Sequence, residues 1–89
     1  MNELDRLRSE IDNLDRDLID ILARRMRCVE RIAEVKRNEG TPTRVPDREV
    51  AVRRVWADES ERHGLDPHSM LSILDTILEM SKQRQEEMR

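Results

Sequence analysis

The first forty residues constrain the fold of this chain more than any other stretch. From residue 2 to residue 39 the sequence holds no proline or glycine, and its apolar residues recur three and four positions apart. That spacing is typical of one continuous amphipathic helix. The apolar stripe comprises Leu4, Leu7, Ile11, Leu14, Leu18 and Ile21, and it resumes at Cys28, Ile32 and Val35. Arg25 stands where the stripe should continue, so one core position of the pattern carries a charge.

Such a helix is too long for the rest of the chain to cover. About 36 residues at the usual helical rise extend roughly 50 Å, about three times the mean helix length. The chain has only 89 residues, of which 42% are charged, with one Trp and no Phe or Tyr. A core of Leu, Ile, Val and Met under that much charge is thin for a monomer. We therefore expect residues 1–89 to form a single domain that dimerises through the long helix.

Two shorter helices are expected after the long one. Gly40 can end the first helix, and the segment GTPTRVP cannot continue it. A second helix is expected from Pro46, which suits a first turn, to about Arg62. A third helix, capped by Asp66, should run to about Glu87. The sequence therefore predicts an all-α fold of three helices, one long and two shorter, in an intertwined helical homodimer.

Composition and motifs exclude several classes of function. The net charge is −3 with both signs interleaved, which argues against a nucleic-acid partner. One cysteine allows no intrachain disulfide and no cysteine-based metal cluster, and Cys28 is expected to be buried as a small hydrophobe. With no signal peptide and no long apolar run, we expect a cytoplasmic protein without a membrane partner. No phosphate loop, nucleophile elbow or metal motif is present, so we expect no cofactor and no metal.

Polar residues interrupt the apolar face of every predicted helix. Lys36 shares a face with Arg25, because eleven residues correspond to three turns plus about 20°. In the third helix the stripe of Met70, Leu74 and Ile77 runs into two polar positions. The complete polar set comprises Arg8, Arg25 and Lys36 in the first helix, Arg48 and Glu49 in the second, and Ser81 and Gln85 in the third.

A helical bundle would bring these polar stretches together. An unpaired charge that faces a core costs several kcal/mol, and the cations outnumber the single carboxylate of Glu49. Each residue taken alone has a simpler interpretation, as a solvated side chain or an arginine that extends to the surface. The conjunction across three helices favours a bound anion with more than one negative group. Arginine suits carboxylates, which its guanidinium can grip with two hydrogen bonds.

Over nearly its whole length the chain resembles the all-α (AroQ-type) chorismate mutases, the chorismate mutase type II family. LRSEIDNLDRDLIDILARRM looks like the signature of the first helix, and IAEVK ends at Lys36 as the family's spacing requires. The tripeptide DRE, residues 47–49, matches the opening of the second helix, and SKQRQ places Ser81 and Gln85 four apart in the third. Each motif is weak alone, but their order and distances are specific together.

The resemblance implies a homodimer whose two sites are each completed by an arginine from the other protomer. Arg8 would be this crossing arginine, and Arg25 would join it in binding the two carboxylates of a small dicarboxylate substrate. Lys36 and Gln85 would hydrogen-bond the ether oxygen, and Glu49 would bind the ring hydroxyl.

Three further residues would complete the site by the same resemblance. Arg48 and Ser81 would complete the carboxylate and pocket contacts. Val45 stands where family members commonly carry Asp, but the contact there resembles a backbone one, so Val45 remains a candidate binding residue.

The implied reaction is the intramolecular rearrangement of chorismate to prephenate in phenylalanine and tyrosine biosynthesis. Three alternatives stay open. An isochorismate pyruvate-lyase uses the same fold, although Glu49 favours the mutase; a 4-amino-4-deoxychorismate mutase is kept open by Val45. From another class, the chain could be a helical dimerisation module without chemistry. The sequence also leaves open whether the enzyme stands alone or belongs to a fusion.

Overall fold

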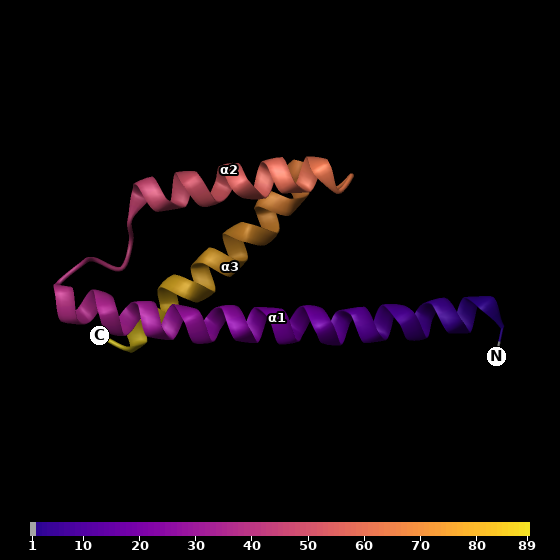
Figure 1. Ribbon diagram of the computed structural model, residues 1–89, viewed down its shortest axis with the longest axis horizontal. Helices are drawn as coiled ribbons and strands as arrows, with labels where there is room; N and C mark the ends of the chain where they lie inside the picture. Colours follow the sequence, from indigo (N-terminus) through magenta and orange to yellow (C-terminus); the bar gives the residue numbers. More distant parts are fainter. Residues whose placement is uncertain (1) are drawn as a thin grey trace.

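The computed structural model describes residues 2–89, which form three α-helices (Figure 1). Helix α1 spans Glu3–Glu39, α2 spans Pro46–Arg62 and α3 spans Pro67–Glu87. No strand occurs within residues 2–89. The predicted all-α class and the three predicted helices are therefore confirmed.

Local chemistry explains where the helices begin and end. The side chain of Asn2 caps α1 by accepting a hydrogen bond from the backbone N–H of Asp5 at 2.8 Å. Gly40 ends α1 in the left-handed conformation, with φ of 73°, which costs glycine little because it has no Cβ. Asp66 caps α3 by accepting from the backbone N–H of Ser69 at 2.9 Å. These interactions depend on nearby residues only, so the sequence pattern could predict them.

Helix α3 packs against both α1 and α2 and carries half of a small core. Leu74 of α3 is fully buried. A guanidinium–carboxylate pair also joins α3 to α1, with Arg84 Nη2 and Glu30 Oε2 2.6 Å apart. The buried apolar residues are Val29 and Ala33 of α1 and Leu74 and Ile77 of α3.

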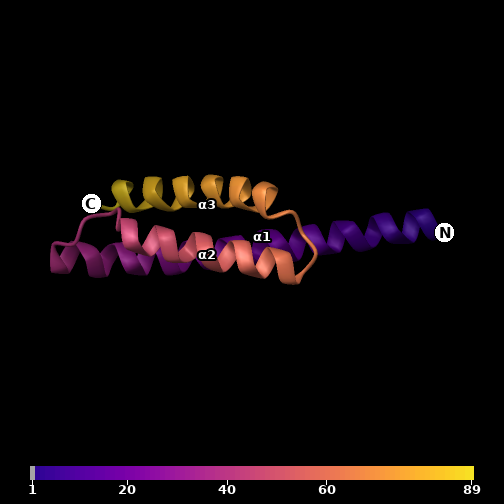
Figure 2. The same ribbon diagram turned by 90° about the horizontal axis from the view of Figure 1, so that it is seen from above.

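The N-terminal part of α1 extends well beyond the other two helices in both views (Figures 1 and 2). The longest dimension is 56 Å and the radius of gyration is 16.5 Å, compared with about 12 Å for a compact domain of this length. Each apolar residue of the stripe from Leu4 to Ile21 is at least half exposed. The chain alone therefore leaves this face of α1 uncovered, and the homodimer that would cover it stays a prediction.

Beyond residue 25 the residues that are buried within the single chain lie beside the predicted stripe, and the predicted burial of Cys28 is wrong for the single chain. Cys28 is exposed, and Val35 is 53% exposed, whereas Val29 and Ala33 are buried. A step of seven residues falls about 20° short of two helical turns. Residues spaced by seven therefore point progressively away from the side of α1 that contacts α3. Val29 and Ala33 lie on that side instead.

Within residues 2–89, none of the helices combines the length and the apolarity that a membrane span needs.

Candidate active site

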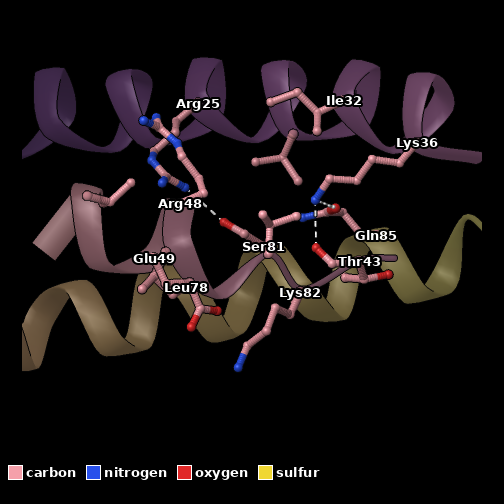
Figure 3. Close-up of a pocket in the computed structure, with 13 residues that line it drawn as sticks. Arg25, Ile32, Lys36, Thr43, Arg48, Glu49, Leu78, Ser81, Lys82 and Gln85 are labelled. Carbon is pink, nitrogen blue, oxygen red and sulfur yellow. Dashed lines mark hydrogen bonds between the residues drawn. The ribbon is translucent and has the colours of Figure 1, made fainter. Parts of the chain in front are cut away.

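Residues of all three helices and of the α1–α2 loop line one pocket of about 300 Å³ (Figure 3). Seven of the eight candidate site residues lie in its wall: Arg25, Lys36, Val45, Arg48, Glu49, Ser81 and Gln85. The remaining wall residues are Val29, Ile32, Thr43, Val52, Leu78 and Lys82. Residues from distant parts of the sequence thus meet at one place, as the interrupted stripes predicted.

Arg8 is the candidate that this pocket does not include. It is exposed on the overhanging part of α1, seventeen residues before Arg25, which corresponds to about 26 Å along the helix axis. No arginine side chain spans that distance, so Arg8 cannot reach the pocket of its own chain.

Lys36 and Gln85 form a polar pair at one end of the pocket (Figure 3). The Lys36 ammonium donates to Gln85 Oε1 at 2.9 Å and to the backbone carbonyl of Thr43 at 2.6 Å. Both acceptors are neutral. Burial lowers the pKa of Lys36 below its ordinary value of 10.5, because leaving water disfavours the charged form. Lys36 therefore brings a positive charge to this end, with dipoles and no counter-charge around it.

The Gln85 side chain is buried, and its amide orientation follows from the contact with Lys36. Because the carbonyl oxygen accepts from the ammonium, the amide nitrogen retains two N–H donors. Within residues 2–89 the hydrogen bond of the Gln85 side chain is the one that its oxygen accepts from Lys36. The pair can therefore offer both a cation and a neutral donor to one acceptor atom.

Thr43 is the contact that the sequence did not predict. Its role comes from a backbone carbonyl, which every residue carries, so residue type gives no signal. Only the position of the α1–α2 loop beside the end of α1 brings that oxygen to Lys36.

Arg25 and Arg48 lie at the other end of the pocket (Figure 3). Arg25 Nη1 donates to Ser81 Oγ at 2.8 Å, and that hydroxyl donates to the backbone carbonyl of Ile77 at 2.9 Å. Ser81 is buried, so it holds the guanidinium in one orientation.

Three of the four cations in the pocket wall, Arg25, Lys36 and Arg48, have no ionic partner among the described residues. Among residues 2–89, no carboxylate oxygen lies within 4.0 Å of a side-chain nitrogen of Arg25, Lys36 or Arg48. Lys82 differs, because its ammonium pairs with Glu79 at 3.3 Å and points away from the other cations (Figure 3). The pocket therefore carries an excess of positive charge.

Glu49 is the single carboxylate in the pocket wall. Its Oε2 lies 3.2 Å from Nε of Arg44, a residue of the α1–α2 loop. The Glu49 side chain is 22% exposed and that of Arg44 is 65% exposed. Glu49 thus faces the pocket while a cation partly neutralises it from outside.

Together the fold and the pocket define an all-α protein with a pocket whose wall carries more cations than carboxylates. Comparison with known proteins narrows this class. A family model described as chorismate mutase type II matches residues 7–86. The chain belongs to the chorismate mutase type II family.

Several relatives bear on the choice of reaction. The chain is 36% identical over 81 residues to the T-protein of Haemophilus influenzae, a match that covers 91% of this chain and 22% of that protein. It is 39% identical over 77 residues to a 4-amino-4-deoxychorismate mutase of Streptomyces venezuelae, with 86% and 75% covered. It is 24% identical over 87 residues to a chorismate mutase of Methanocaldococcus jannaschii, with 98% and 88% covered. The chain spans about a fifth of the length of the T-proteins that it matches.

Proposed function

We propose that residues 1–89 form a single chorismate mutase domain, which converts chorismate to prephenate in the cytoplasm for phenylalanine and tyrosine biosynthesis. The observation that carries the proposal is the set of three cations without ionic partners around a pocket that also contains a buried amide. The substrate has two carboxylates and an ether oxygen that gains negative charge as its C–O bond breaks. The negative charges of the substrate would pair with the cations of the pocket that have no ionic partner.

Substrate folding is the first task of the site. The reaction breaks one C–O bond and forms one C–C bond within one molecule, so the flexible substrate must be held in a folded conformation. Arg25, oriented by Ser81, and Arg8 of a second copy bind the two carboxylates, and Arg48 completes these contacts. Two observations support a homodimer with this crossing arginine: the uncovered apolar face of α1 and the distance of Arg8 from its own pocket.

Charge stabilisation is the second task. Lys36 and Gln85 donate to the ether oxygen from fixed positions, so little reorganisation is needed when the bond stretches. Glu49 accepts a hydrogen bond from the ring hydroxyl, and Val45 lies in the same pocket wall. These steps use no cofactor, metal or nucleophile.

Turnover of chorismate tests the proposal directly. When purified protein is mixed with chorismate, the ultraviolet absorbance of chorismate should fall as the substrate is consumed. Chromatography should identify the product as prephenate. Pyruvate formed from isochorismate alone would instead identify a lyase. No turnover of chorismate, isochorismate or 4-amino-4-deoxychorismate would overturn the enzymatic proposal and leave a dimerisation module.

A second candidate is a 4-amino-4-deoxychorismate mutase. The relative of that name from Streptomyces venezuelae favours it, and Val45 in place of the usual Asp keeps it open. A higher kcat/KM on the amino compound than on chorismate would select this candidate.

The lowered pKa of Lys36 predicts how activity depends on pH. The pH dependence of kcat/KM reports the ionisations of the free enzyme, and the proposed role of Lys36 needs its protonated form. We therefore expect kcat/KM to fall as pH rises through the pKa of Lys36, which lies below 10.5. A bound dianion favours the charged ammonium, so kcat should fall at a higher pH than kcat/KM. Both profiles can be measured with chorismate up to the pH at which the protein unfolds. A kcat/KM that stays constant beyond 10.5 would contradict the role of Lys36.

A further inference from the structure

The ion pair between Arg44 and Glu49 crosses the wall of the pocket. Glu49 lines the pocket, whereas Arg44 contributes to the outer surface of the α1–α2 loop and is absent from the pocket wall. Arg44 Nε approaches Oε2 of Glu49 at 3.2 Å, and the closest approach of this pair involves only that one oxygen. A carboxylate has about four lone-pair positions, so Glu49 can accept a further hydrogen bond from inside the pocket.

We propose that Arg44, through its ion pair with Glu49, makes the site prefer a neutral hydroxyl to a protonated amine at the ring position that Glu49 contacts. The inference rests on the proposed function, because the ring hydroxyl of chorismate is the group assigned to Glu49. In the amino analogue a primary amine replaces that hydroxyl, and amines of this kind are largely protonated at neutral pH.

Charge decides between the two groups. An unpaired carboxylate would attract an ammonium more strongly than a hydroxyl, since only the ammonium carries a net charge. Arg44 cancels much of that attraction and repels the ammonium itself. A hydroxyl loses little, because Glu49 still accepts its hydrogen bond.

The neighbouring residue adds no charge that would reverse this preference. Val45 follows Arg44 in the chain and lines the same wall as Glu49, but its side chain is apolar. Arg48 and Lys82 line the same pocket in the wild type and in a variant at position 44, so such a substitution changes the charge beside Glu49 without altering the pocket lining.

The size of the effect follows from the exposure of Arg44, whose side chain is 65% accessible. Solvent screens such pairs, and exposed ion pairs change an equilibrium by roughly fivefold at most. We therefore expect the ratio of kcat/KM for 4-amino-4-deoxychorismate to that for chorismate to rise roughly three- to fivefold in Arg44→Gln. If Arg44 had only a structural role, its substitution would lower kcat/KM for both compounds by the same factor and leave their ratio unchanged.

The experiment measures kcat/KM for both compounds in wild-type protein and in Arg44→Gln. Arg62→Gln is the matched control, because Arg62 is also exposed and pairs with a carboxylate, that of Glu59, at 2.8 Å at the far end of α2. In Arg62→Gln the ratio of the two kcat/KM values should equal that of the wild type. In a Glu49→Gln background, Arg44→Gln should raise the ratio less than it does beside an intact Glu49, because only the direct repulsion between Arg44 and the ammonium remains.

The outcomes separate this inference from the proposed function. If the wild type converts chorismate and Arg44→Gln leaves the ratio unchanged, the inference is overturned while the proposed function stands. If the wild type converts neither compound, calorimetry gives the ratio of their binding constants in the same variants, and an unchanged ratio again overturns the inference. If neither compound binds the wild type, both proposals fail.

Discussion

Replacing Lys36 with methionine is expected to lower kcat by about 10²–10³-fold, the usual cost of losing one preorganised donor to a developing negative charge. Methionine keeps much of the length and volume of the lysine side chain but carries neither charge nor donor. In the wild type the ammonium donates to Gln85 Oε1 and to the backbone carbonyl of Thr43. The variant leaves both oxygens without this donor. The measurement is the steady-state rate of chorismate consumption at saturating substrate.

Lys82→Met is the matched control for this substitution. Lys82 is the only other lysine of the chain, and its ammonium pairs with Glu79 instead of facing the other cations. It should retain most of the wild-type rate. Similar losses in both variants would indicate a general effect of removing positive charge, and an unimpaired Lys36→Met would exclude Lys36 from catalysis.

Arg8→Ala and Arg25→Ala are each expected to be nearly inactive alone and to regain activity when they are unfolded and refolded together. The reason is geometric: Arg8 lies about 26 Å along α1 from Arg25, so a complete site needs Arg8 of one chain and Arg25 of the other. In a mixed dimer one site has both arginines and the other has neither. Random pairing should restore roughly a quarter of the wild-type activity, because about half of the dimers are mixed and each has one intact site.

Refolded single variants and refolded wild type serve as controls for the treatment itself. Sedimentation should give twice the chain mass of 10.6 kDa for all samples. Mixed dimers without any recovered activity would contradict a site shared between protomers. Full activity of Arg8→Ala alone would exclude Arg8 from the site.

Positions within one helix were the most predictable part of the candidate site. Arg25 interrupts an apolar stripe, and the structure explains the interruption by a hydrogen bond to Ser81 and a place in the pocket wall. Lys36, Ser81 and Gln85 could be identified in the same way, because the direction of a helical side chain follows from its position along the helix. That these residues bind and convert a substrate stays a prediction.

Contacts between segments were not predictable from the pattern. The carbonyl of Thr43 and the pair of Arg44 with Glu49 depend on the path of the α1–α2 loop. Cys28 was expected to be buried and is exposed, because the direction of the inner face along α1 is set by where α3 packs.

Helix periodicity and capping depend on neighbouring residues, so the three helices, their ends and the polar positions on each apolar face follow from the sequence. Which of those positions share a pocket, and which part of α1 stays uncovered, follows instead from how the helices pack. The packing of α3 across α1 and α2 brings Gln85 to Lys36 and Ser81 to Arg25. Such packing depends on the fit of whole helix faces, and no local spacing encodes it.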